Sequence, residues 1–299
     1  SGWSGSVSTE AGTGGSSVAG QRGTLWLADD ELLGSTIVGT TWRLYGITAW
    51  SPASLSMSGA AALSFEEPGF ALTVAGDAVI DGSALSFGLN GPSDPAATTF
   101  GIGGSLLLTN AASLALYGGN ATQNGAVTNY GALIGVTNDL VIATNAVLYV
   151  YSHPTNGGSV RLSMRDLTVA AGGRILADDA GFEGSVVPTG TKAYGPGGGY
   201  AFLDGGGGGS YGGRGRGRDG AMVYVGNTYG SSNAPAIPGS GGGGGSFTSG
   251  NPRGGRGGGL VRIDARGDVT VDGTISANGG AGDSGNTGGG SGGAVYITT

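Results

Sequence analysis

Three aspartates occupy the same place in a repeated pattern, and their carboxylates are the side chains best placed to do chemistry. Asp139, Asp166 and Asp268 each stand immediately before an alternating apolar triplet. If the triplets are equivalent strands of one sheet, the three carboxylates form a column with a spacing of about 4.8 Å. Carboxylates this close repel one another, so they must share protons, bind a cation or accept hydrogen bonds from backbone N–H groups.

Two kinds of functional site are compatible with such a column. Oxygen ligands suit Ca²⁺, so Asp139, Asp166 and Asp268 are candidate calcium ligands. Paired carboxylates also act as acid and base in glycan cleavage, which makes the same residues the candidate catalytic groups. The structural alternative, which we favour, is that each aspartate caps the amides of its own turn. We expect no other cofactor, because the chain has no cysteine and a single histidine, His153, predicted to lie in a solvated loop.

Two arginines form a second column. Arg161 and Arg262 are predicted to point outward from equivalent strands, and Asp264 lies two residues further along on the same face. Stacked guanidinium groups favour an anion, such as a uronate or sulfate of a glycan, or Asp264 itself. Arg161, Arg262 and Asp264 are therefore candidate ligand-binding residues, and neutralisation by Asp264 is the favoured structural alternative.

The tryptophans are confined to the start of the chain. Trp3, Trp26, Trp42 and Trp50 all lie in the segment that ends at Trp50, with Tyr45 beside them. Flat aromatic faces suit sugar rings, so Trp26, Trp42, Tyr45 and Trp50 are candidate glycan-binding residues. We favour the alternative that these bulky side chains cover the open end of a repeat structure.

The elements that must position these residues are short repeated strands. Alternating triplets begin at Leu72, Leu106, Leu140, Leu167 and Val269; the first three intervals are similar and the fourth is much longer. Each triplet is followed by a second alternating strand, and most are preceded by a third. Three short strands in about 30 residues are typical of a solenoid in which each coil stacks on the last. The sequence therefore predicts an all-β fold, a parallel β-helix (β-solenoid), with Leu, Val and Ile pointing inward.

The long fourth interval indicates a glycine-rich lateral insertion. One coil accounts for only part of the interval from Leu167 to Val269, and the remainder matches the length of the glycine-rich stretch 181–258. This segment is either a flexible tether or a set of polyglycine-II-like rods that pack closely because no Cβ intervenes. We favour the rods, because "YAFLD" and "AMVYVGNTYG" supply apolar residues that a tether does not need.

The repeat divides the chain into four parts. Residues 1–66 are expected to form an N-terminal cap and irregular first coils, and 67–180 the regular coils. Residues 181–258 are the insertion, and 259–299 the final coils. Val295 follows Val261 by the same interval that separates Leu72 from Leu106, so a further coil is expected to begin at Ala294. We expect self-association, or further coils of the same polypeptide, to cover this C-terminal end.

Net charge and the lengths of the apolar runs exclude two classes of partner. Arg214, Arg216 and Arg218 resemble an RGG box, but the net charge of −7 has the wrong sign for a protein that binds phosphate backbones. No apolar run approaches the length of a membrane span. We therefore expect neither nucleic-acid binding nor membrane insertion.

Two stretches resemble known families. The three-strand coils with Thr-Asn turns at Thr109-Asn110 and Thr144-Asn145 resemble the right-handed, pectate-lyase-like β-helix superfamily. The stretch "GGRGGGLVRIDARGDVTVDGTISANGG" resembles segments of large glycine-rich bacterial surface proteins. The resemblance implies an extracellular or cell-surface location and an adhesive or polysaccharide-related role. It transfers no catalytic residue.

These observations predict a non-catalytic role. We expect an extracellular structural or adhesion module, a rigid β-helical segment of a larger surface protein or fibre, with polysaccharide as a candidate ligand. The alternative is a polysaccharide lyase or glycoside hydrolase of β-helix type. An enzyme would need a base, a charge neutraliser and a cleft in one place.

Overall fold

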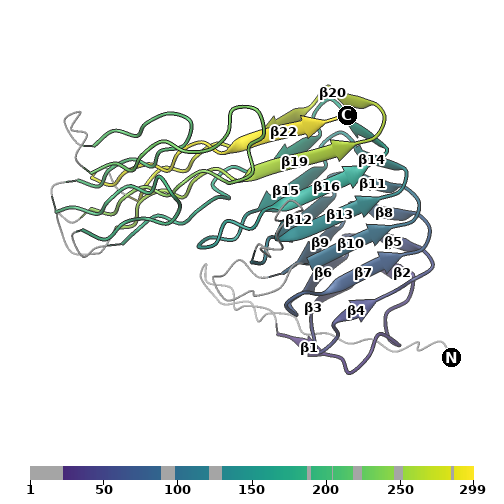
Figure 1. The fold of residues 1–299 in the computed structure, drawn as a ribbon. Coiled ribbons are helices and arrows are strands. Elements are labelled where there is room, and N and C mark those ends of the chain that lie inside the picture. The colour runs from purple at the N-terminus through teal and green to yellow at the C-terminus, as the bar shows by residue number, and fades with distance from the viewer. Residues whose placement is uncertain are drawn as a thin grey trace.

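The fold consists of strands wound into a three-sided coil (Figure 1). The structure, a computed structural model, describes residues 23–88, 98–120, 130–186, 190–203, 205–217, 224–245, 252–283 and 286–299. Within these ranges all regular elements are β-strands, and every pair of neighbouring strands in the three sheets is parallel. The predicted all-β parallel β-helix is confirmed.

Each coil contributes one strand to each of three sheets, here named A, B and C. Sheet A contains β1 (Leu25–Trp26), β3 (Thr41–Tyr45), β6 (Ala62–Phe65), β9 (Ala84–Phe87), β12 (Ser113–Tyr117), β15 (Val147–Tyr151), β18 (Arg174–Leu176) and β21 (Thr274–Ser276). Sheet B contains β2 (Thr36–Val38), β5 (Leu55–Ser58), β8 (Ala78–Asp81), β11 (Leu106–Thr109), β14 (Asp139–Ile142), β17 (Asp166–Val169) and β20 (Val269–Val271). Sheet C contains β4 (Ala49–Trp50), β7 (Ala71–Val74), β10 (Thr98–Ile102), β13 (Ala132–Val136), β16 (Val160–Met164), β19 (Leu260–Ala265) and β22 (Ala294–Thr298).

One predicted alignment is wrong. The triplet at Leu72 belongs to sheet C and pairs with Phe100, whereas Leu106 pairs with Ala78 in sheet B. Both stretches show the same period-2 alternation, which reports an inward side chain but not the sheet to which the strand belongs. The other four triplets do lie in one sheet, as predicted.

The interior of the coil is a continuous apolar column. Its first half is aromatic: Trp50, Phe65, Phe70, Phe87 and Phe100 stack or tilt against one another with centroid separations of 4.2–6.0 Å. The second half is filled by buried Leu, Ile and Val side chains that face one another from successive coils. Burial of this column supplies the main stabilisation of the coil.

The glycine-rich segment leaves the coil between sheets A and C and forms a bundle of extended rods (Figure 1). Rod 239–245 is buried along its length and bonds through its backbone to neighbours on all sides. The rods that surround it are 181–186, 191–194, 199–203, 205–210, 252–259 and 286–293. Six neighbours around one rod is hexagonal packing, and this arrangement matches the packed alternative rather than the tether.

The hydrogen bonds of the central rod repeat every third residue. Donation from Gly239 and Gly242 reaches one rod at Gly258 and Gly255. Two further rods show the same spacing. In rod 286–293 the N–H groups of Gly288 and Ser291 donate to Gly243 and Ser240, and in rod 199–203 those of Gly199 and Phe202 donate to Gly241 and Gly244. A period of three residues is that of an extended helix of the polyproline II type, which makes no internal hydrogen bonds and directs all of them sideways.

The bundle is joined to the coil through backbone contacts at its base. The N–H of Ser152 donates to Ala180 at 2.8 Å, and the N–H of Gly259 donates to Ala177 at 2.7 Å. Segments 277–283 and 286–293, within the range expected to form the final coils, also bond to the bundle, as the N–H of Gly280 donates to Arg256 and the N–H of Gly288 donates to Gly243, each at 2.8 Å. The described part of the insertion is thus an extension of the coil's hydrogen-bonded framework.

The prediction for His153 is wrong. Its side chain is buried, and Nδ1 accepts the N–H of Asn156 at 3.0 Å. The first rod of the bundle covers this loop, because the N–H of Glu183 donates to Pro154 at 2.9 Å. The sequence could not indicate that cover, since it depends on the path of the insertion.

Candidate functional site

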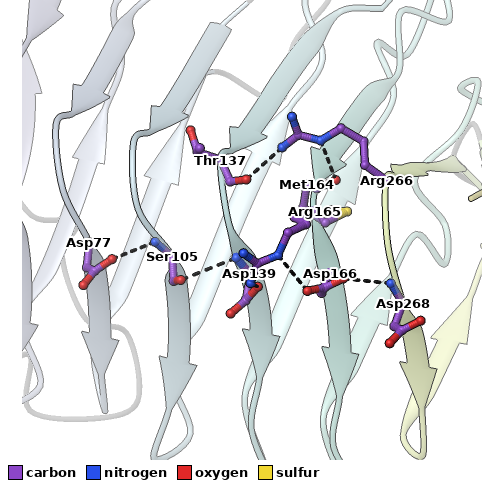
Figure 2. A network of polar contacts seen from close by, with 9 residues as sticks. All are labelled: Asp77, Ser105, Thr137, Asp139, Met164, Arg165, Asp166, Arg266 and Asp268. Carbon is purple, nitrogen blue, oxygen red and sulfur yellow. Dashed lines mark hydrogen bonds and ion pairs between the residues drawn. The ribbon is translucent and has the colours of Figure 1, made fainter.

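The predicted aspartate column exists at the start of the sheet B strands, and two more residues extend it (Figure 2). Asp77 Oδ1 accepts the N–H of Ser105 at 2.8 Å, and Ser105 Oγ accepts the N–H of Asp139 at 3.4 Å. Further along, Asp166 Oδ1 accepts the N–H of Asp268 at 2.8 Å. The side chains of Asp77, Ser105 and Asp166 therefore bond to the backbone of the next coil, and for Asp166 this replaces the bond to its own turn that the capping alternative stated.

A guanidinium group separates the two central carboxylates. Arg165 Nη2 donates to Asp139 Oδ1 at 2.5 Å, and Arg165 Nε donates to Asp166 Oδ2 at 2.8 Å. These bonds from Arg165, together with the N–H of Asp268, hold the pKa of Asp166 below its usual value. The like-charge repulsion expected between Asp139 and Asp166 is thus relieved by a cation from the chain itself.

The geometry favours a structural role for this column. Among the described residues, no three His, Cys, Asp or Glu side chains are grouped so that they could hold a metal ion. The roles of Asp139, Asp166 and Asp268 as calcium ligands or catalytic groups stay predictions. Asp77 was missed because the incorrect alignment of Leu72 hid the strand that follows it. Ser105 stands directly before the correctly aligned Leu106 and was missed because it is not a carboxylate.

Removal of Arg165 tests this account. We expect Arg165→Met to lower the melting temperature at pH 7, because Asp139 and Asp166 then face each other without a cation, and we expect millimolar Ca²⁺ to reverse part of the loss. Arg174→Met is the matched control, since Arg174 is also exposed and begins β18. If EDTA lowers the melting temperature of the wild-type chain, the column holds a metal and the structural account is contradicted.

The arginine column is also present, on the outer face of sheet C. Asp264 Oδ2 lies 2.5 Å from Arg161 Nε and 3.5 Å from Arg262 Nε, and the hydroxyl of Thr298 donates to Asp264 Oδ1 at 2.9 Å. Burial raises the pKa of Asp264, but the hydrogen bonds from Thr298 and Arg161 and the two positive charges outweigh it, so the pKa lies below its usual value. Asp264 therefore neutralises part of the column, and two guanidinium groups against one carboxylate leave one positive charge in excess.

A shallow groove that the sequence analysis missed crosses the same sheet beside this cluster. Its volume is about 440 Å³. Thr73, Gly101, Gly135 and Ser163 form one outward column along it, because each pairs with the next across the sheet. Arg266 lies at its rim, where Nη2 donates to the carbonyl of Thr137 at 2.8 Å (Figure 2). The sequence signal for this groove is the pair Gly101 and Gly135, which lack side chains at equivalent outward positions of neighbouring strands.

The candidate aromatic residues separate into two groups. Trp42 and Trp50 are buried, so their ring faces are not accessible to a sugar, which favours the covering role. Tyr45 is half-buried in β3, and Trp26 is 68% exposed in β1. Trp3 lies outside the described residues.

Two arginines of the RGG-like stretch, Arg214 and Arg216, flank Gly215, which lies against the rod 205–210. The carbonyl of Arg216 accepts the N–H of Gly208 at 2.9 Å, so its backbone takes part in rod packing. Arg218 lies outside the described residues.

The comparisons give no family. The chain matches no protein-family model, no curated protein and no solved structure. In the described part of the chain, no helix is of the length and apolarity needed to cross a membrane.

Proposed function

We propose that the chain is an extracellular structural or adhesion module, a rigid β-helical segment of a larger surface protein or fibre. The observation that carries the proposal is the bundle of glycine rods, whose backbone bonds continue those of the coil through Ala177, Ala180 and Gly259. A lateral domain built in this way holds its shape through many short backbone hydrogen bonds. Such a design suits a spacer or a display platform.

The alternative is a polysaccharide lyase or hydrolase, and the groove on sheet C is the observation that favours it. Only one of the residues that line this groove in the described structure, Arg266, is ionisable. Cleavage of a glycan needs a base or acid beside the scissile bond, and an arginine remains protonated at all relevant pH values. The groove therefore supports glycan binding better than glycan cleavage.

We also propose an interaction at the C-terminal end of the coil. Val295 and Ile297 align with the buried Val261 and Ile263, yet Val295 is 42% exposed because no strand packs on its free side among the described residues. In the described structure, the end of the coil exposes the unpaired edges of the last strands of the three sheets, β20, β21 and β22. The partner that best fits these edges is another β-helical coil, from the same polypeptide or from a second copy.

Retention and cleavage measured in one assay distinguish the two functions. Beads coated with the protein are passed under flow over surfaces that carry a panel of polysaccharides, and released fragments are assayed for new reducing ends and unsaturated sugars. The proposal predicts bead retention on at least one surface without cleavage products. Cleavage products would establish the enzyme, and a failure of retention on every surface would count against adhesion through glycans.

A further inference from the structure

Trp26 is the most exposed large apolar side chain among the described residues, and its indole ring packs against the backbone at Gly46. The indole lies against the backbone of Gly46, where a Cβ would come within 2.7 Å of both Cε2 and Nε1 of the ring. Gly46 has a φ of +91°, which also requires glycine. The ring is thus supported by a glycine while 68% of the residue stays open to solvent.

A carboxylate lies beside the contact between Trp26 and Gly46. Glu67 Oε1 accepts the N–H of Gly46 at 2.7 Å, so the carboxylate and the indole contact the same residue. Glu67 is itself partly exposed, and its carboxylate has lone pairs beyond the one that accepts from Gly46. An exposed aromatic ring beside a hydrogen-bond acceptor is an arrangement suited to a ligand with one apolar face and a rim of hydroxyl groups.

The surrounding charge restricts the ligand further. Glu66 is already paired with Arg43 at 3.1 Å, so Arg43 is engaged by a carboxylate. The segment that follows β1 adds the exposed carboxylates of Asp29, Asp30 and Glu31. Among the described residues of these segments negative charge predominates, which disfavours uronates, sulfates and phosphates.

We propose that Trp26 and Glu67 form a binding subsite for a neutral hexopyranose of a polysaccharide. The indole stacks on the apolar C–H face of the sugar ring, and Glu67 accepts a hydrogen bond from a ring hydroxyl. The subsite rests on the proposed adhesive function and names one class of ligand for it. It lies on the outer face of sheet A, apart from the groove and the arginine cluster, which are on sheet C.

The test uses the full chain and cellohexaose, a soluble chain of neutral β-linked glucose, with hexagalacturonate as the anionic counterpart. Binding is measured by calorimetry, and contact with the indole is followed by tryptophan fluorescence in a Trp3→Phe background. The variants are Trp26→Ala and Glu67→Gln. The matched control is Val38→Ala, which also truncates an exposed apolar side chain, in sheet B.

We expect cellohexaose to shift the fluorescence and to bind more tightly than hexagalacturonate. Trp26→Ala should weaken binding at least about tenfold, a loss of about 1.4 kcal/mol, because stacking is the main contact. Glu67→Gln should weaken it less, and Val38→Ala should not change it. Each variant is first shown to melt like the wild type, which is expected because Trp26 lies outside the core.

Two results would overturn the subsite: wild-type protein that does not bind cellohexaose, or Trp26→Ala protein that binds it unchanged. Failure of the subsite remains distinguishable from failure of the proposed function. If beads coated with Trp26→Ala protein are retained under flow as well as wild type, adhesion stands and this subsite is wrong. If wild-type beads are retained on no surface, the adhesive function itself is wrong.

Discussion

Gly242→Ala is expected to disrupt the glycine-rich bundle while the coil remains folded. A Cβ on Gly242 would overlap with the carbonyl group of Gly288 in the adjacent rod. Because the obstacle is the backbone of Gly288 and Gly289, no side-chain rotation can relieve the overlap, and the two rods must separate. We expect a loss of at least about 3 kcal/mol, at the upper end of the range for overpacking. Separation would also break the bond from the N–H of Gly242 to Gly255, at 2.8 Å.

The matched control is Gly213→Ala, in the same domain. A Cβ on Gly213 would meet no atom within 4 Å, and its φ is not positive. This variant should be neutral or more stable by about 0.4–1 kcal/mol, because alanine restricts the unfolded chain. Urea denaturation gives the stabilities, and trypsin cleavage at Arg214 and Arg216 reports opening of the bundle. Equal stability and equal cleavage of the two variants would contradict the rod packing.

Phe87→Ala is expected to destabilise the coil rather than the bundle. Phe87 is fully buried and packs against Phe65, Phe70 and Phe100, with centroid separations of 5.6, 6.0 and 5.2 Å. Truncation removes the contacts of one ring with three others and leaves a cavity, at a cost of about 3–5 kcal/mol. The free energy of unfolding in urea measures the loss.

The control variant is Val38→Ala, which tests whether the loss of stability in Phe87→Ala depends on burial of the side chain. Val38→Ala removes an apolar side chain from another strand of the β-helix, but Val38 is 61% exposed, so its stability should change by less than about 0.5 kcal/mol. If Phe87→Ala were as stable as Val38→Ala, the aromatic column would not be the core of the first coils.

The sequence predicted the coil well because its signal is local. Alternation of apolar and polar residues in each strand, repeated at a coil's length, requires stacked parallel strands whatever the rest of the chain does. The stacking of Asp139 on Asp166, and of Val261 on Val295, followed from that pattern. The sheet that contains Leu72 was misassigned because two sheets have the same alternation.

The features that the sequence could not predict depend on contacts between distant segments. The hexagonal packing of rod 239–245 involves six segments separated by loops of different length, and glycine carries no side-chain pattern from which their pairing could be read. The position of Arg165 between Asp139 and Asp166 depends on the direction in which its side chain points, which the sequence pattern does not specify. Burial of His153 depends on where the first rod lies.

Amide hydrogen exchange of the central rod is the most direct test of the central claim, that the glycine-rich segment is a rigid extension of the coil. The N–H groups of Gly239, Gly241, Gly242 and Gly243 are buried and donate to Gly258, Tyr194, Gly255 and Gly207. Measured by NMR on the full chain, these four amides should exchange as slowly as amides of the sheet strands, since exchange then requires the bundle to open. Exchange of the four amides at the rate seen for the urea-unfolded chain would contradict the account and show a tether.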